Sequence, residues 1–229
     1  MKKKILLIGN NDGLPGVKID LANYKKYFKS STGGQWNDDE IIELLNPKKD
    51  NLIALIDDLK KQNLDYVIVV FSGHGGIQRK TVLELNPDGE LFSESRFENI
   101  SKRQVTILDC CRAYMQNISE SLNEVRLVKS FSAYAGTRAR FEKRISESLP
   151  QQIKIYSCAE GEYSHDTPKG GAYSKNLLES AYSDDSDFIY FGRTHVVASE
   201  KTTKEFKDQH PEIIQSKLLT TQQIILGIN

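Results

Sequence analysis

The strongest constraint on the fold of this 229-residue chain is a set of short apolar runs that recur along it. Four stand out, at residues 5–8, 66–71, 105–108 and 153–158, and β-branched side chains crowd the second of them. Runs of this length and composition predict buried strands. Helical patterns separate the runs, and that alternation is typical of a mostly parallel sheet covered by helices.

Three further segments carry apolar residues at helical spacing, and we interpret these stripes as facing the core. They are Val17, Leu21, Tyr24 and Phe28; Leu52, Leu55, Ile56 and Leu59; and Tyr173, Leu177, Leu178 and Ala181. Near the C-terminus, residues 188–191 and 195–198 predict another strand or a hairpin. Residues 213–228 show no pattern that places them.

Each of the four predicted strands ends in polar or reactive residues. These are residues 9–13, 72–76, 109–111 and 159–161. Ligands of open α/β sheets bind beyond the carboxyl ends of the strands. The sequence therefore predicts that these four ends converge on one site.

His74 is the strongest candidate for a general base among the four histidines. It follows the most strand-like run and has a glycine on each side, Gly73 and Gly75. Glycine lets the backbone turn sharply and lets a substrate approach closely. Imidazole exchanges a proton near neutral pH, as a base that serves a nucleophile must.

A candidate nucleophile follows the next predicted strand, where Asp109, Cys110 and Cys111 precede Arg112. The thiolate is the reactive species, and a neighbouring histidine or positive charge lowers the pKa of its thiol. Alternation sends the two cysteines to opposite faces of a strand, but it does not say which one faces the crevice. Packing of both cysteines in the core is the alternative interpretation.

The charge and the cysteine content of the chain limit the cellular compartment and the binding partners that we expect for it. Lys and Arg number 31 and Asp and Glu number 31, so no net positive charge attracts nucleic acid or an anionic membrane. Three cysteines, two of them adjacent, do not make a disulfide framework. No apolar stretch approaches the roughly 18 residues of a membrane span. We expect a cytoplasmic protein with no membrane partner and no direct contact with nucleic acid.

Residues 112–152 differ from the rest of the chain. Few periodic apolar residues occur between positions 130 and 150, and a long stretch without a regular element is unusual in a compact domain. Such loops are functional or disordered, and a solvated surface excursion is the alternative. The basic residues of this region are Arg126, Lys129, Arg138, Arg140, Lys143 and Arg144.

The order of these motifs resembles the caspase and metacaspase family of cysteine peptidases. The resemblance is carried by a strand followed by Ser-Gly-His-Gly, a later strand followed by Asp-x-Cys, and segments 14–21, 156–162 and 170–178. It implies a caspase-like three-layer α/β sandwich with a mostly parallel central sheet flanked by helices. The implied single domain, residues 1–229, divides into a large-subunit-like part (1–112), an intersubunit-like linker (113–152) and a small-subunit-like part (153–229).

By this resemblance His74 is the catalytic histidine and Cys111 is the nucleophile. Cys110 is then the residue between the nucleophile and Asp109. The backbone N–H groups of Gly75 and Cys111 are the implied oxyanion donors.

The resemblance also bears on the substrate. Caspases that cut after aspartate carry an arginine just beyond the first strand, and residues 9–12 contain none. Metacaspase-like enzymes line this pocket with acids, and Asp109 and Glu160 fall at two such positions, although Glu160 also fits a plain loop carboxylate. A partly desolvated carboxylate favours a cation, so we expect cleavage after Arg or Lys. The basic residues of the linker then become candidate self-cleavage sites.

Two function classes stay open at this stage. One is an active cysteine endopeptidase that acts on proteins or peptides; the other is a catalytically silent caspase-like scaffold or ligand-responsive module. We expect no metal site and no cofactor, because no Cys/His spacing resembles a zinc site and no phosphate-binding glycine loop is present. Calcium dependence stays open, although no ligand loop for it is visible.

Only analogy with other members of the family suggests a biological role. A compact chain of this kind is similar to prokaryotic family members, some of which act in antiphage defence and are switched by an activating partner or a nucleotide signal. The residues name no signal, no physiological substrate and no oligomeric state.

Overall fold

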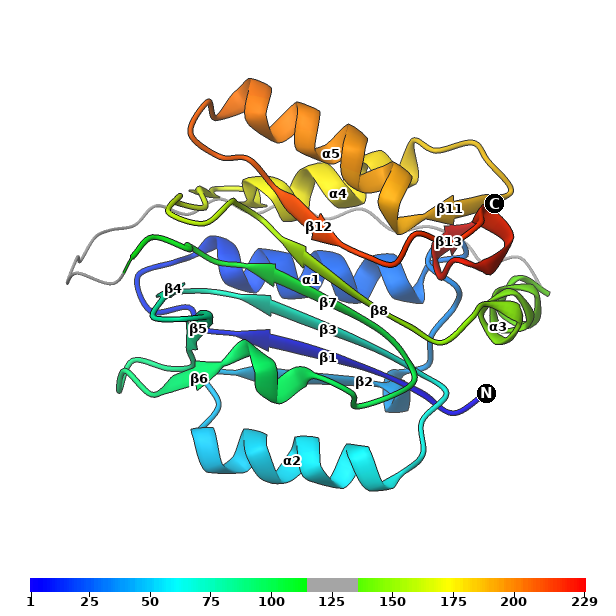
Figure 1. Cartoon of the computed structure of the whole chain (residues 1–229), viewed down its shortest axis with the longest axis horizontal. Helices are drawn as coiled ribbons and strands as arrows, with labels where there is room; N and C mark the ends of the chain where they lie inside the picture. The colour runs from blue at the N-terminus through cyan, green and yellow to red at the C-terminus, as the bar shows by residue number, and fades with distance from the viewer. Residues whose placement is uncertain (115–135) are drawn as a thin grey trace.

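A six-stranded sheet forms the middle layer of the structure, a computed structural model that describes residues 1–114 and 136–229 (Figure 1). Its strands are β1 (Lys3–Gly9), β2 (Ile41–Leu45), β3 (Tyr66–Ser72), β7 (Arg103–Asp109), β8 (Gln151–Tyr156) and β12 (Glu212–Ile214). They lie in the order β12-β8-β7-β3-β1-β2, and only β12 is antiparallel to its neighbour. The four strands expected from the apolar runs are confirmed as neighbours in the centre of this sheet.

Alternating side chains of these strands supply two separate hydrophobic cores, one on each face of the sheet. On β1, for example, Ile5 and Leu7 belong to one core and Leu6 and Ile8 to the other. Because both faces are buried, the strands read as continuous apolar runs, as is usual for parallel sheets.

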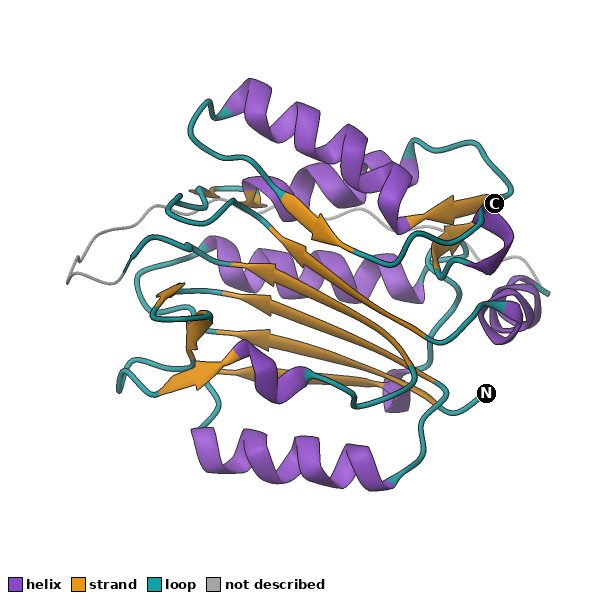
Figure 2. Cartoon of the chain, in the orientation of Figure 1, coloured by secondary structure: helices purple, strands orange, loops and turns teal. Residues whose placement is uncertain are grey.

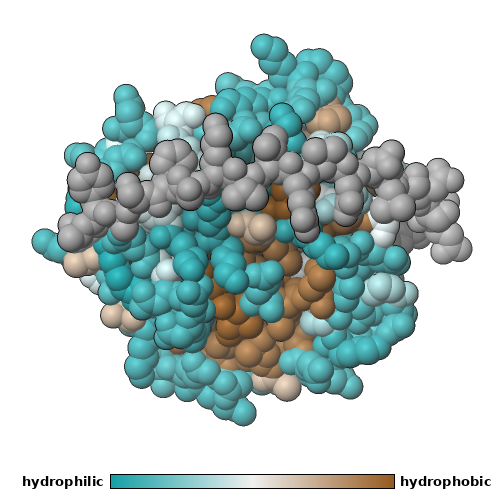
Figure 3. Space-filling model, turned by 180° about the vertical axis from the view of Figure 1, so that it is seen from behind, coloured by the Kyte–Doolittle hydropathy of each residue, from teal (hydrophilic) through white to brown (hydrophobic). Residues whose placement is uncertain are grey.

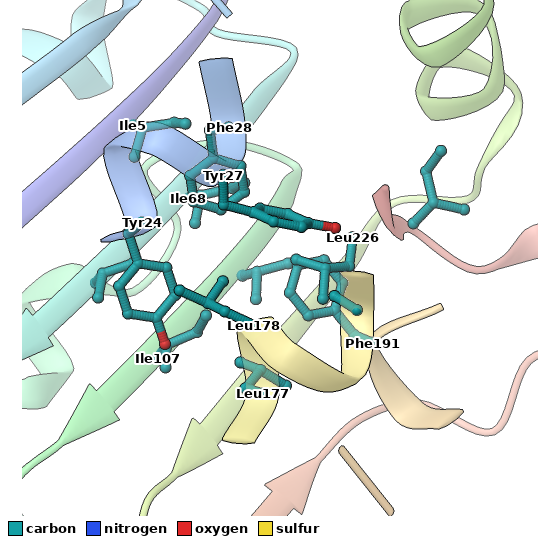
Figure 4. Packing of buried hydrophobic residues seen from close by; sticks show 14 of the residues in the cluster. Ile5, Tyr24, Tyr27, Phe28, Ile68, Ile107, Leu177, Leu178, Phe191 and Leu226 are labelled. Carbon is teal, nitrogen blue, oxygen red and sulfur yellow. The ribbon is translucent and has the colours of Figure 1, made fainter. Parts of the chain in front are cut away.

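Helices cover both faces and complete the three layers (Figure 2). The first core takes side chains from α1 (Gly16–Lys29), α3 (Thr137–Glu147), α4 (Ala172–Tyr182) and α5 (Phe191–Glu205). Figure 4 shows Tyr24 and Phe28 of α1 and Leu177 and Leu178 of α4 packed together in it. The second core takes Leu52, Ile56 and Leu59 from α2 (Lys49–Lys61). The three expected helices are therefore confirmed.

Small elements surround the main sheet. A three-stranded sheet of β4 (Gly75–Ile77), β5 (Thr81–Glu84) and β6 (Leu91–Ser93) packs on the α2 face, where Leu83 and Phe92 join the second core. The remaining elements are β9 (Asp166–Thr167), β10 (Gly170–Gly171), β11 (Phe188–Tyr190), β13 (Ile225–Ile228) and the short 3-10 helices η1 (Asp38–Glu40), η2 (Glu94–Phe97) and η3 (Thr220–Gln222).

The C-terminal expectation is partly wrong. Residues 188–190 do form a strand, β11, but its antiparallel partner is β13, and residues 195–198 lie inside α5. His195 and Ala198 lie on the buried side of this helix. The two β-branched residues between them, Val196 and Val197, are exposed, and their residue type led to the expectation of a strand.

The expectation that residues 112–152 lack a regular element is wrong for their second half, where α3 forms. Its buried face consists of Phe141, Arg144 and Ile145, so only two apolar residues signal a helix of 11 residues. Stabilisation comes from polar contacts to distant segments, which a search for apolar spacing does not detect.

Parallel pairing places the carboxyl ends of β1, β3 and β7 in one row. Gly9 lies beside Ser72 and Ser72 lies beside Asp109, and Figure 1 shows these arrowheads at one edge of the sheet. The residues that follow each strand therefore begin from adjacent points.

No helix in residues 1–114 and 136–229 is long and apolar enough to cross a bilayer. Seen from behind, hydrophobic residues gather in the middle of the face and hydrophilic residues surround them (Figure 3).

Candidate functional site

His74 stands two residues beyond the end of β3. The link is Gly73, whose φ of 154° suits glycine and whose N–H donates a hydrogen bond to the carbonyl of Asp109 at 3.1 Å. A side chain at position 73 would meet the backbone of Asn10 at 3.0 Å. This turn ties β3 to β7 and holds the histidine over the edge of the sheet.

The His74 ring is oriented by a backbone carbonyl. Its Nε2 lies 2.6 Å from the carbonyl oxygen of Asp12, in the loop after β1. A carbonyl only accepts hydrogen bonds, so Nε2 carries the proton and Nδ1 of the neutral ring is the free base. The contact with Asp12 is invisible to sequence reasoning because the Asp12 side chain takes no part in it.

Cys111 is the half-buried member of the adjacent cysteine pair, whereas Cys110 is 1% exposed. Cys110 belongs to the core on the α2 face, and a Cβ built on Gly75 would lie 2.7 Å from its sulfur. The Cys111 thiol donates to the carbonyl of Ser164 at 3.7 Å and accepts the Ser164 N–H at 3.4 Å. The thiol of Cys111, not that of Cys110, therefore borders the loop beyond β8.

Burial dominates the ionisation of all three thiols. It raises the pKa of Cys111, with the charge of Asp109 adding to the rise and the Ser164 backbone opposing it. The pKa of Cys158 is raised to about 12, chiefly by burial, and that of Cys110 rises strongly for the same reason. The raised pKa favours the protonated thiol of Cys111, and such a thiol would need a base to act as a nucleophile.

Asp109, two residues before Cys111, points to the face of the sheet that α1 and α4 cover, and it is 5% exposed. One carboxylate oxygen accepts the Ser164 hydroxyl at 2.7 Å. The other accepts the N–H and hydroxyl of Ser174, at 3.1 and 2.5 Å, at the start of α4. A side chain on Gly171 would collide with this carboxylate, so the glycine makes room for it.

Asp20 is a second buried carboxylate beside Asp109, and no sequence motif points to it as a site residue. It accepts the hydroxyl of Ser72 at 2.7 Å and the N–H of Gly171 at 3.0 Å. Burial raises its pKa well above the ordinary range, and the charge of Asp109 raises it further. A signal existed in the sequence, because Asp20 stands three residues after Val17 and four before Tyr24, inside the apolar stripe of α1.

Asp166 on β9 is the third carboxylate of this group. It accepts the N–H of Gly16 at 3.1 Å, at the first residue of α1, where the helix dipole favours a negative charge. Burial raises its pKa, and the charge of Asp109 contributes to the rise. We call Asp20, Asp109 and Asp166 the acid cluster.

Glu160 lies elsewhere in the structure. Its carboxylate pairs with Arg112 at 3.3 Å, and its side chain is 62% exposed. Arg112 is buried and also pairs with Glu212 at 2.6 Å. Since this guanidinium already balances its charge, Glu160 contributes less to a cation pocket than Asp20 does.

The basic residues of the predicted linker fall into two groups. Arg126 and Lys129 lie outside the described residues. Arg138, Arg140, Lys143 and Arg144 lie on α3, where Arg138 pairs with Glu40 at 2.6 Å and Arg144 donates to two backbone carbonyls. Cleavage at these four positions would require the helix to open first.

The other histidines have structural partners. His195 is buried, its pKa is lowered to about 4 by burial, and it contacts the Tyr173 hydroxyl at 2.8 Å. His165 stacks on Phe206 and lies 3.0 Å from Asp208. Within residues 1–114 and 136–229, no group of three or more His, Cys, Asp or Glu side chains is arranged to hold a metal ion.

Comparisons with known proteins agree with this geometry. A family model described as the caspase domain matches residues 2–221. The structure is similar to caspase-1 from Spodoptera frugiperda, with a TM-score of 0.63 and 13% sequence identity over 99% of this chain and 89% of that one. At that identity the likeness establishes the fold. A comparison with curated proteins found no match.

Proposed function

The chain belongs to the caspase-domain family of cysteine peptidases, and from that premise we propose that it is an endopeptidase that cuts after Arg or Lys with Cys111 and His74. The observation that carries the proposal is the acid cluster beside Cys111. Its three carboxylates receive hydrogen bonds from N–H and O–H groups, and in the described part of the chain none pairs with Lys or Arg.

A positively charged substrate side chain supplies the charge that the acid cluster lacks. Burial raises the pKa of Asp20, and the neighbouring charge of Asp109 raises it further by repulsion. A guanidinium or ammonium group placed between them relieves that repulsion and makes charge-assisted hydrogen bonds, each worth about 1.5–3 kcal/mol. An aspartate side chain in the same pocket adds a like charge, so cleavage after Asp is disfavoured.

The reaction follows from the two oriented side chains. Nδ1 of His74 takes the thiol proton of Cys111, and the sulfur attacks the peptide carbonyl to form a tetrahedral oxyanion. Backbone N–H groups of Gly75 and Cys111 are the proposed donors to that oxyanion. His74 then gives its proton to the leaving amine, and water hydrolyses the thioester to restore the thiol.

Substrate binding must displace Ser164 from the nucleophile. The backbone N–H and carbonyl of Ser164 are hydrogen-bonded to the thiol of Cys111, and its hydroxyl donates a hydrogen bond to the Asp109 carboxylate. A substrate that brings a carbonyl to the thiol and a cation to Asp109 replaces both sets of contacts.

Self-processing is a further part of the proposal. The supporting features are the basic residues between Cys111 and α3, and the candidate sites are Arg126 and Lys129, because the other four basic positions lie within α3. Limited cleavage would appear as two fragments in the wild type and one 26.0 kDa band in a Cys111→Ala variant.

The deciding experiment compares the wild type with Cys111→Ala and His74→Ala on three fluorogenic peptides that end in Arg, Lys or Asp. We expect wild-type hydrolysis after Arg and Lys, and a loss of at least about 1000-fold in both variants. Hydrolysis of the Asp peptide would contradict the specificity. No hydrolysis of any peptide, with or without calcium and reducing agent, would favour a silent scaffold.

A further inference from the structure

One aromatic side chain close to the nucleophile is exposed without a role in the mechanism above. Tyr114 is 67% exposed, more than any other aromatic residue in the described part of the chain. Single exposed apolar side chains are ordinary on protein surfaces. Tyr114 is of interest because it lies three residues after Cys111.

The backbone that leads into Tyr114 is held by two neighbouring segments. The Ile77 N–H of β4 donates to the carbonyl of Ala113 at 3.0 Å, and Ile77 forms a bridge with Tyr114. One residue earlier, Arg112 exchanges hydrogen bonds of 2.9 Å with Glu162 and Gly161. A Cβ on Gly161 would contact the Tyr114 ring at 3.5 Å, so the ring lies beside a glycine that leaves it uncovered.

Tyr114 and the acid cluster lie on opposite faces of the central sheet. Asp109 points to the face of α1 and α4, where it meets Ser174. Ile77 belongs to the small sheet that packs on the α2 face. Cys111 stands between them, at the edge where the two faces meet.

The direction of the substrate follows from the chemistry. The side chain that precedes the cut bond enters the acid cluster, while the leaving amine must reach His74, which donates its proton. Residue 75, directly after His74, begins β4, and β4 ends at Ile77 beside Tyr114. The part of the substrate that follows the cut bond therefore leaves along β4 toward Tyr114.

We propose that Tyr114 forms a subsite for a large apolar side chain in the leaving part of the substrate, one to three residues after the cut bond. This rests on the proposed function. A ring held by its backbone loses little freedom on binding, and covering roughly 60 Å² of apolar surface is worth about tenfold in kcat/KM.

The test uses internally quenched peptides with one Arg and a variable leaving part. Each of the three positions after Arg is changed in turn from Gly to Leu, and the readout is the ratio of kcat/KM for Leu to that for Gly. Such a ratio, taken within one enzyme, does not depend on how much of a variant is folded. Tyr114→Ala and Tyr114→Phe are compared with Tyr163→Ala, the matched control, because Tyr163 is another exposed tyrosine, in the segment between β8 and β9.

In the wild type, Leu at one position should raise kcat/KM about tenfold. Tyr114→Ala should bring that ratio to about one, while Tyr114→Phe and Tyr163→Ala should keep it. A ratio near one at all three positions in the wild type, or an unchanged ratio in Tyr114→Ala, overturns the subsite and leaves the proposed function intact. Failure of the wild type to cut any Arg peptide overturns the proposed function itself.

Discussion

Two groups of charged side chains lie at opposite ends of the central sheet, and they differ in whether cations and carboxylates are paired. At the amino end, Lys3 lies 3.1 Å from Glu142, and Arg138 pairs with Glu40 at 2.6 Å and Glu142 at 3.0 Å. The Met1 ammonium is a third cation there, 3.5 Å from Glu142, so both carboxylates of this group face cations. At the carboxyl end, the acid cluster contains carboxylates alone.

The two groups also differ in what they connect. The amino-end group joins β1, η1 and α3, and the Lys3 ammonium lies over the Trp36 ring at 4.2 Å. Hydrogen bonds from Arg138 and from the Asn37 N–H outweigh the effect of burial and lower the pKa of Glu40, whereas burial raises that of Asp20. Paired charges at the amino end join separate segments of the fold, whereas no Lys or Arg in the described part of the chain pairs with the acid cluster.

Removing one partner of the amino-end group should have the largest effect on stability. Glu40→Ala leaves Lys3, whose side chain is fully buried, and Arg138 without one of their anions. Breaking such a pair costs about 3 kcal/mol in the free energy of unfolding, measured by urea denaturation. The control is Glu43→Ala on β2, whose pair with Lys25 is about 40% exposed on both sides and worth less than about 0.5 kcal/mol. Equal losses in the two variants would contradict the structural role of the amino-end group.

The corresponding change in the acid cluster should act in the opposite direction. Asp20→Asn removes a carboxylate that is costly to ionise and keeps an oxygen for the Gly171 N–H. We expect a gain on the order of 1 kcal/mol in stability at pH 7 and a loss of about tenfold in kcat/KM on Arg peptides. Asp57→Asn on the exposed face of α2 should change neither quantity. A destabilised but fully active Asp20→Asn enzyme would refute the contrast.

The pH dependence of stability should separate the two groups further. The folded protein holds the Asp20 proton more tightly than the unfolded chain does, so stability rises as the pH falls from the raised folded pKa of Asp20 toward the unfolded value of about 3.9. Glu40 has the opposite sign, and its contribution is lost as the pH falls below about 4.3. Denaturation between pH 4.5 and 7.5 should show a smaller gain on acidification in Asp20→Asn than in the wild type. A difference between the two proteins that does not change with pH would disprove this linkage.

The smallest expected effect is on the pKa of the Cys111 thiol, which the charge of Asp109 raises. Alkylation requires the thiolate, so the raised pKa predicts slow labelling by iodoacetamide at pH 7, increasing about tenfold per pH unit past the ordinary thiol pKa near 8.5. Asp109→Asn should accelerate labelling at pH 7 by a few-fold, because burial remains the larger cause. Mass spectrometry assigns the label, with the buried Cys110 and Cys158 as internal controls. Faster labelling of wild-type Cys111 than of free cysteine would contradict the raised pKa.

The centre of the fold was predictable because its signals are local. β1 and β3 are apolar on both faces, β7 and β8 carry short apolar runs, and α1, α2 and α4 have apolar residues at helical spacing. β2 was missed because only Ile41 of its five residues is buried, as expected for a strand at the edge of a sheet. The helix α3 was missed because ion pairs to residues such as Glu40, about a hundred positions away, anchor it.

The candidate site was predictable only where it depends on side-chain identity within a motif. His74, Cys111 and Asp109 belong to short patterns after strands. Asp20 is 89 positions from Asp109 in the sequence, and only the packing of α1 on the central sheet brings it next to the end of β7. The carbonyl of Asp12 and the backbone of Ser164 make their contacts through main-chain atoms, so the residue types at these positions do not predict the contacts.

The fit between Gly75 and Cys110 limits the order in which mutations can accumulate. A Cβ at position 75 would meet the Cys110 sulfur at 2.7 Å and its Cβ at 2.9 Å, so even alanine at position 110 leaves too little room. Only glycine at 110 clears both contacts, and the carbonyl of Val82 would still lie 3.0 Å away. Lineages that keep a side chain at 110 are therefore confined to glycine at 75. Substitutions at position 110 in the core and at position 75 after His74 are therefore coupled, because position 75 can change only after position 110 has become glycine.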